Sequence, residues 1–451
     1  MSQVSENKMG SMPEGRLVVT MSLPIMLSML VQALYNIVDS AFVARISEDA
    51  LTAVSLAFPV QLLMIACAIG MGVGINVLLS RSLGQKRQEE ADAVAMNGIF
   101  LSICLWIVFA ALGLLFGRRF IASFTDVATV VEMGTSYVTV VTTASCGVFL
   151  LFVAERFMQA TGNTVYHMIT QLIGAVLNCI LDPLLIFGIG PFPRLGTTGA
   201  ALATVLAQII AMLIGFWINI RFNHDVNLRL RGFRPNGAIL RGIIRIGLPA
   251  AVQQSLLSLL TVCMNRVLMP FSQTAVSFYG VYYKLQNFLY MPIYGLNNAL
   301  IPMIGYNYGA QRHDRIHRIT RSALLLSLGI MAAGTLLFEL APVPLLRLFN
   351  ASDEMLAIGV PAIRIIAISF CLAGVSVALC GCMQGLGRSG ASLAVALVRQ
   401  FIVVLPAVML LARVSLPAVW FAFPLAEAVG FAVALLLYRR QSAMPPEQKA
   451  G

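Results

Sequence analysis

Asp39 stands in an otherwise apolar stretch, Leu17 to Val43, in which it is the only charged side chain. A span of about 20 apolar residues crosses a bilayer as a helix, because a helix satisfies its own backbone hydrogen bonds in hydrocarbon. A carboxylate at that depth is disfavoured by roughly 2.5 to 3.5 kcal/mol, so it needs a partner, a proton or an ion. The sequence therefore predicts a functional acid inside a membrane.

Asp182 is a second acid of this kind, and Asn178 lies four residues earlier on the same helix face. At a rise of about 1.5 Å per residue, Asp39 and Asp182 lie roughly 33 and 27 Å from the starts of their helices. Thr204 belongs to a segment that begins at the opposite surface, and it reaches a similar level about 10 Å down. We expect these four side chains to converge if their helices adjoin.

The chemistry of such a cluster has two interpretations. Two carboxylates in one dry pocket repel each other strongly, so the pair suits the binding and release of a proton. Carboxylate, amide and hydroxyl oxygens are also hard ligands for a small cation such as Na⁺. Either way we predict a coupling-ion site, and the alternative is a polar clamp between helices. His313 and His317 have only Asp314 nearby, so we predict no other metal.

The composition bounds the class of protein that holds these residues. Of 451 residues, 59% are hydrophobic and 11% charged, whereas a soluble protein carries about 25% charged residues. The net charge of +11 does not indicate nucleic-acid binding, because Lys and Arg lie between apolar segments. The eight cysteines fall in or beside apolar segments and are interpreted as core residues. The first 16 residues carry no signal-peptide pattern. We predict a polytopic membrane protein.

Charged, Gly-rich and Pro-rich breaks divide the chain into apolar segments that predict transmembrane helices. Positive charge is unevenly distributed: twenty Lys and Arg residues fall on the side of the N-terminus and six on the other. This bias predicts cytoplasmic termini, in a prokaryotic cytoplasmic membrane. The twelve segments are 17–43, 51–79, 93–116, 130–153, 164–188, 197–220, 242–268, 275–304, 319–341, 357–380, 390–412 and 417–438.

The sequence repeats itself at an offset of 225 residues, as in Leu23-Pro24 and Leu248-Pro249, or Gly84 and Gly309. Six segments per half make the two copies parallel, with a cavity expected between them. The predicted fold is all-α, with twelve transmembrane helices in two six-helix bundles. Pro24 and Pro249 are candidate hinges, or static kinks. The predicted parts are an N-terminus (1–16), N-lobe (17–220), linker (221–241), C-lobe (242–438) and C-terminus (439–451).

The second half lacks the acids of the first, since Met264 and Ala407 stand at the corresponding positions. Lys284, Arg399 and Glu427 each lie about ten residues into their segments, near the midplane. We interpret them as a salt-bridged cluster that stabilises the C-lobe, with a substrate contact as the alternative.

Two further features have two interpretations each. Glu155, beside Arg156, is either a local ion pair or an inner-gate acid. The aromatic segment 275–304 contains Tyr290, Met291 and Tyr294. Such side chains suit flat, cationic ligands but also ordinary helix packing. All four residues are therefore candidates for gating or substrate binding.

The sequence resembles the multidrug and toxic compound extrusion (MATE) transporters, in a DinF-like branch. The resemblance covers essentially the whole chain and is carried by LPIMLSMLVQALYNIVDSAFVARI (23–46), FMQATGNT (157–164), LNCILDPLLIFG (177–188), GAALAT (199–204) and YNYGAQ (306–311). It implies that Asp39, Asn178, Asp182 and Thr204, with the carbonyl of Ala200, form a cation site. Tyr35 and Asn36 belong to the same matching pattern and are added as candidates for gating or substrate contact.

The expected function is an antiporter that exports small organic, often cationic compounds by alternating access, driven by H⁺ or Na⁺. A flippase for a lipid-linked saccharide or another amphiphile is the alternative. An enzyme is not expected, because the chain has no HExxH or GxSxG motif. We expect no cofactor besides the coupling ion, no nucleic-acid partner, and a monomer in the lipid bilayer.

Overall fold

The structure is a computed structural model that describes residues 7–228 and 233–442. The remaining residues of the predicted N-terminus, linker and C-terminus (1–6, 229–232 and 443–451) lie outside the described residues. Helix is the only regular secondary structure in the described part. The first half contains α1 (Lys8–Ser11), α2 (Glu14–Ala44), α3 (Glu48–Gly84), α4 (Gln88–Ala122), α5 (Ala128–Thr143), α6 (Cys146–Ala160), α7 (Thr164–Phe187) and α8 (Gly196–Phe222).

The second half begins with α9 (Gly237–Leu268), α10 (Gln273–Gly309) and α11 (His313–Leu340). It continues with the short α12 (Pro342–Arg347), then α13 (Asp353–Ala367) and α14 (Phe370–Gly385). The chain ends in α15 (Ser389–Leu397), the π-helical η1 (Val398–Val403), α16 (Val404–Leu411), α17 (Leu416–Val419) and α18 (Ala422–Ser442).

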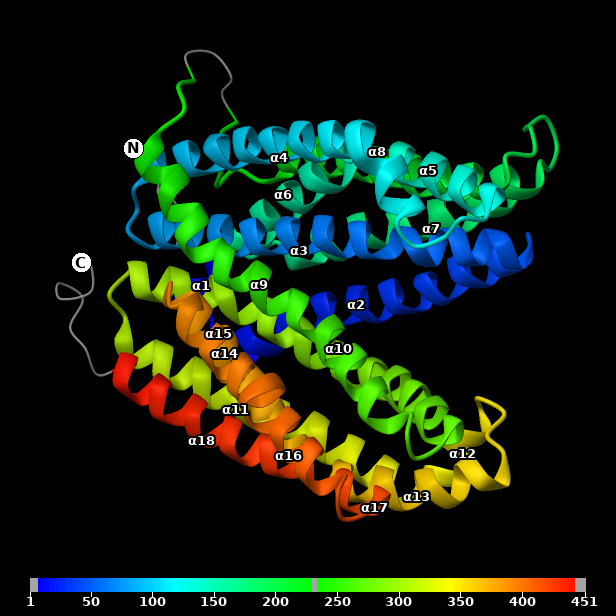
Figure 1. The fold of residues 1–451 in the computed structure, drawn as a ribbon. Coiled ribbons are helices and arrows are strands. Elements are labelled where there is room, and N and C mark those ends of the chain that lie inside the picture. Colours follow the sequence, from blue (N-terminus) through cyan, green and yellow to red (C-terminus); the bar gives the residue numbers. More distant parts are fainter. Residues whose placement is uncertain (1–6, 229–232, 443–451) are drawn as a thin grey trace.

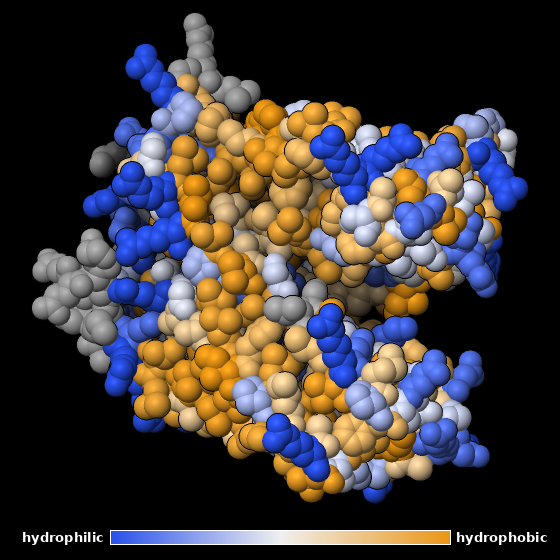
Figure 2. Space-filling view, viewed as in Figure 1, coloured by the Kyte–Doolittle hydropathy of each residue, from blue (hydrophilic) through white to orange (hydrophobic). Residues whose placement is uncertain are grey.

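These helices account for the twelve predicted spans. Within the described residues, nine helices are long and apolar enough to cross a membrane. Two more spans are bent pairs, α5 with α6 at 41° and α13 with α14 at 51°. The twelfth, α10, has 37 residues but is rich in Tyr and Asn. Figure 2 shows an apolar belt between hydrophilic ends. The predicted all-α fold class is confirmed, and the chain is an integral membrane protein.

The helices form two lobes that meet at the end where both chain termini lie and diverge toward the other end (Figure 1). We call these the closed end and the open end. Two pairs of helices connect the lobes: α2 of the first lobe packs against α10 of the second, and α9 of the second packs against α3 of the first. This pairing follows the internal repeat, since α9 and α10 are the second-half copies of α2 and α3.

Glycines allow the closed end to pack tightly. A Cβ added at Gly84 would collide with the carbonyl oxygen of Tyr306, and one added at Gly309 would collide with that of Arg81. Tyr306 and Gly309 follow Arg81 and Gly84 by 225 residues, so the two contacts are copies of one another. The pseudo-two-fold axis therefore passes between α3 and α10.

Pro24 and Pro249 lie inside α2 and α9, which both continue through them. Each belongs to a helix that crosses from one lobe to the other, which is the place where a hinge would act. Their role as hinges stays a prediction.

Candidate functional site

The two predicted acids meet where α2 packs against α7. Asp182 is fully buried and Asp39 is half-buried. Their carboxyl groups lie within hydrogen-bonding reach of one another. Because a carboxylate has no hydrogen to donate, such a contact needs a proton on one of the two groups or a cation between them.

Asn178 and Thr204 complete the cluster, as their helix positions predict. With its amide nitrogen toward Asp182, Asn178 donates to Oδ2 at 2.9 Å, and its oxygen accepts from the backbone N–H of Thr204 at 3.3 Å. The Thr204 hydroxyl lies 3.1 Å from the carbonyl oxygen of Ala200, to which it donates. Pro183 follows Asp182 and has no N–H, so the carbonyl of Cys179 lacks its usual helical partner. Carboxyl, amide, hydroxyl and carbonyl oxygens thus gather in one place.

Two tyrosines border the acids, and one of them escaped the sequence analysis. Tyr35 lies one turn before Asp39 and interacts electrostatically with both carboxyl groups. Tyr137 on α5 does the same, and its hydroxyl accepts a hydrogen bond from Gln61 at 3.1 Å. The signal for Tyr137 was only a polar ring in an apolar segment. Asn36, by contrast, is exposed on α2.

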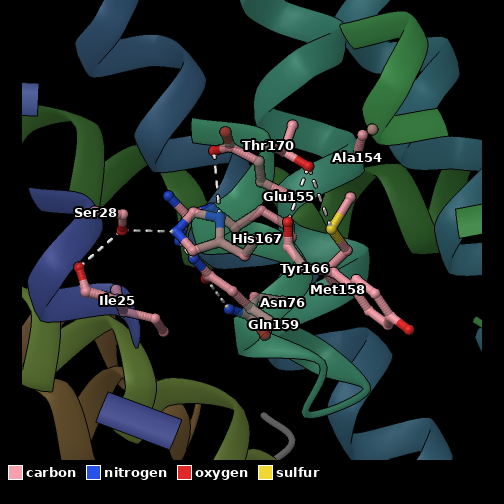
Figure 3. A network of polar contacts seen from close by, with 12 residues as sticks. Ile25, Ser28, Asn76, Ala154, Glu155, Met158, Gln159, Tyr166, His167 and Thr170 are labelled. Carbon is pink, nitrogen blue, oxygen red and sulfur yellow. Dashed lines mark hydrogen bonds and ion pairs between the residues drawn. The ribbon is translucent and has the colours of Figure 1, made fainter. Parts of the chain in front are cut away.

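A second buried acid lies in the same lobe, nearer the closed end. Figure 3 shows Glu155, Gln159 and His167 gathered between α6 and α7. The Glu155 carboxyl is fully buried, with Oε2 at 3.8 Å from His167 Nδ1. Arg156 interacts electrostatically with Glu155, but its Nη1 donates to Gln159 Oε1 at 2.6 Å, so the direct partner of Arg156 is Gln159. Helix periodicity explains this choice of partner, since adjacent residues point in different directions.

Gln159 is the hub of this network. Its Oε1 also accepts from Asn76 Nδ2 at 3.2 Å, and its Nε2 lies 3.3 Å from His167 Nε2. Ser28 of α2 lies 3.4 Å from the same imidazole nitrogen. The network therefore connects α2, α3, α6 and α7, and His167 was a member that the sequence analysis missed.

A small cavity extends from the first site toward the second. It has a volume of about 60 Å³ and is lined by Asn178 and Thr204 at one end and by Thr170 and Gln171 at the other. The Gln171 amide interacts with the Glu155 carboxyl. This volume holds a few water molecules, each needing at least about 10 to 15 Å³.

The C-lobe carries a different buried pair. Arg399 Nη2 donates to Glu427 Oε1 at 2.7 Å, and their side chains are only 12% and 17% exposed. Arg399 lies in the π-helical η1, which packs against α18. Gly430 provides the space, because a Cβ there would collide with Arg399 Cγ.

Lys284 does not belong to this pair, so the predicted cluster of three charges is wrong. The Lys284 side chain is exposed, with its ammonium nitrogen 6.0 Å from the centre of the Phe349 ring. A shared depth fixes the level of a residue in the membrane but not the direction in which it points.

The aromatic candidates lie beside the Arg399–Glu427 pair. Tyr290 is buried and packs edge-on against Phe370, with ring centres 6.0 Å apart. Tyr294 packs against Tyr290 at 6.1 Å, and Met291 is half-buried. Tyr290 therefore serves helix packing, while a substrate contact by Tyr294 or Met291 stays a prediction.

Fold and site together define the class of protein: a two-lobed integral membrane transporter built from a duplicated six-helix unit, with a buried acidic site in the first lobe. The MatE family model matches residues 24–184 and again 249–410, one match in each half. The chain belongs to this family, the multidrug and toxic compound extrusion transporters. Assignment to the DinF-like branch stays a prediction.

Known relatives match over most of their lengths. The chain is 28% identical to an FAD transporter of Shewanella oneidensis, over 88% of each chain. It is 26% identical to the multidrug export protein MepA of Staphylococcus aureus, over 92% of this chain and 91% of that one. A crystal structure of MATE in complex with MaL6 superposes with a TM-score of 0.91 at 25% identity, covering 98% of this chain and 99% of the other.

Proposed function

We propose that the protein is a cation-coupled antiporter that exports small organic, often cationic compounds by alternating access. The observation that carries the proposal is the meeting of Asp39 and Asp182 beside Asn178 and Thr204. The multidrug export function of the staphylococcal relatives supports the substrate class.

The coupling ion is H⁺ or Na⁺, and no other cofactor is required. Binding of either ion neutralises the repulsion between the two carboxyl groups and lets α2 pack more closely against α7. Because α2 also contacts α10 of the other lobe, this movement changes the contact between the lobes. One inward charge supplies about 2.3 kcal/mol per 100 mV, enough to support a gradient of exported compound.

Glu155 is the inner acid of this scheme. Both of its carboxyl oxygens are buried, and the side chains that face them are the Gln171 amide and the His167 imidazole. The 60 Å³ cavity offers water a place between the two acidic sites. A proton released from Asp39 and Asp182 would then pass toward Glu155 through water in this cavity, beside Gln171.

The orientation follows from charge. The excess of Lys and Arg at the closed end supports a cytoplasmic position for that end, and for both termini, in a prokaryotic cell. The open end then faces outward and can load the coupling ion. The protein acts as a monomer, because one chain contains both lobes and the complete site.

The test is dye efflux from proteoliposomes under an imposed pH gradient or an imposed Na⁺ gradient. We expect Asp182→Asn and Asp39→Asn to reduce gradient-driven ethidium efflux at least tenfold, since a neutral amide cannot exchange the coupling charge. Asp126→Asn, a change of the same kind at an exposed position, is the matched control. The gradient that drives wild-type efflux identifies the ion. Normal efflux by Asp182→Asn would refute the coupling role.

An anionic substrate is the second candidate, because the Shewanella oneidensis relative is an FAD transporter. Lys284 is exposed on α10, where it could contact an anionic group of a dinucleotide or of a lipid-linked saccharide. Efflux of FAD, but of no cationic dye, from the same proteoliposomes would favour this candidate. Loss of FAD efflux in Lys284→Gln would support the contact.

A further inference from the structure

The internal repeat creates two equivalent clefts at the closed end, each between one lobe and the other. The first cleft lies beside the loop Thr161–Asn163 and is filled by α1. Met9 of α1 is fully buried against Leu17 and the neighbouring α10. The Asn7 side chain donates to the carbonyl oxygen of Thr161 at 2.9 Å.

Side chains of the second lobe hold α1 in this first cleft. Arg315 Nη2 donates to the carbonyl oxygens of Met9 at 3.2 Å and Met12 at 2.7 Å. Asn307 Nδ2 donates to the Met9 carbonyl as well, at 3.0 Å. The first cleft is thus occupied by the chain itself.

The second cleft is lined by residues that follow those of the first by 225 positions. Leu386, Gly387 and Arg388 take the places of Thr161, Gly162 and Asn163. Here the structure has a cavity of about 580 Å³. The described residues that precede α9 run along α4 instead, where the Asn236 N–H donates to Asn97 Oδ1 at 2.8 Å.

Three arginines line this cavity, and its lining contains no acidic residue among the described ones. Arg81 comes from α3 of the first lobe, and Arg245 and Arg388 come from the second lobe. Three guanidinium groups in one wall give the cavity a positive potential that favours an anion.

Arg81 is already oriented within the cavity wall. Its guanidinium stacks over the Tyr308 ring at 4.5 Å and donates through Nη2 to the carbonyl oxygen of Leu386 at 3.3 Å. Its Nε is buried without a hydrogen-bond partner. Guanidinium groups bind phosphate oxygens through two parallel hydrogen bonds, which a buried N–H would complete.

We propose that this second cleft, which we call the arginine cleft, binds a phosphate-bearing anion. The group that the cleft would recognise is a phosphate attached to a polar molecule. It belongs either to the headgroup of an anionic phospholipid or to a soluble phosphorylated compound. A volume of about 580 Å³ accommodates such a group with part of the attached molecule. Because Arg81 and Arg388 belong to different lobes, the bound anion holds the lobes together at the closed end.

Binding is measured on the purified full-length protein in neutral detergent, with no transport involved. The probes are dihexanoyl phosphatidylglycerol, with dihexanoyl phosphatidylcholine as its zwitterionic counterpart, and inorganic pyrophosphate as the soluble phosphate. We expect saturable binding of the phosphatidylglycerol or of pyrophosphate, weakened by added salt. Preference for the lipid identifies a membrane source, and preference for pyrophosphate identifies a soluble one.

Variants distinguish binding in the arginine cleft from nonspecific attraction of anions to the basic surface of the protein. Arg388→Asn introduces the residue that the first half carries at the same place, and we expect it to weaken binding roughly tenfold or more, as does Arg81→Gln. Arg221→Gln, at an exposed end of α8, removes the same charge elsewhere and should leave binding unchanged. Absence of saturable binding, or equal affinity in Arg388→Asn and wild type, would overturn the proposal.

Discussion

The buried pair in the C-lobe allows a structural role to be separated from a substrate contact. Glu427→Gln keeps the side-chain volume and an oxygen that can accept from Arg399, so only the charge is lost. Two opposite charges about 4 Å apart attract by about 4 kcal/mol at an effective dielectric constant near 20. The second Glu427 oxygen and Arg399 Nε have no other hydrogen-bond partner among the described residues, so nothing else compensates the guanidinium. We expect Glu427→Gln to lower the free energy of unfolding by about 3 kcal/mol.

The assay is a reversible unfolding titration in mixed micelles, followed by circular dichroism. The double variant Arg399→Met/Glu427→Leu should lie within about 1 kcal/mol of wild type, because it removes both charges and keeps the packing. Glu339→Gln is the matched control, since its 3.9 Å contact with Arg364 joins side chains that are 33% and 55% exposed and should contribute under about 1 kcal/mol. A Glu427→Gln protein as stable as wild type but inactive in efflux would refute the structural role and favour a substrate contact.

Three further predictions test other parts of the fold. Gly309→Ala places a methyl group against the backbone of α3, so we expect a loss of about 1 to 3 kcal/mol in unfolding free energy, whereas Gly280→Ala on the same helix meets open space and should be neutral or stabilising. Gln159→Leu removes the hub of three buried hydrogen bonds and should destabilise by about 3 kcal/mol in the same titration; a loss below 1 kcal/mol would contradict the network. Burial raises the pKa of Asp225, in the connector after α8, so the wild type loses stability as pH rises from the ordinary carboxyl range through that raised pKa. Asp225→Asn, which can still accept from Asn7, should therefore have a higher melting temperature than wild type near pH 7, and the gap should disappear near pH 3.

The sequence could predict the level of each polar residue but not its direction. The fixed rise of a helix placed Asp39, Asp182 and Thr204 in one layer, and their helices do adjoin. The same reasoning placed Lys284 with Arg399, and it was wrong because the two side chains point to different surroundings. Adjacency of helices depends on packing between distant segments, which a single sequence does not encode locally.

Some elements have no local signal at all. The four-residue α1 is too short and too polar to be predicted from periodicity, and it is stabilised by hydrogen bonds from Arg315, three hundred residues away. The π-helical turn that carries Arg399 has no local sequence signal either. The Arg399 side chain fits there because Gly430, on a different helix, leaves space for it. Such features arise from tertiary contacts that override local preference.

The two halves have the same arrangement of helices but different buried side chains. At the positions that correspond to Asp39 and Asp182, the second lobe has Met264 and Ala407, which are buried in an apolar core with Trp420. A close-packed apolar core resists rearrangement, whereas a polar layer changes its packing when an ion neutralises it. We therefore infer that ion binding rearranges helices within the first lobe, while the second lobe moves as a rigid body through its contacts with α2 and α3.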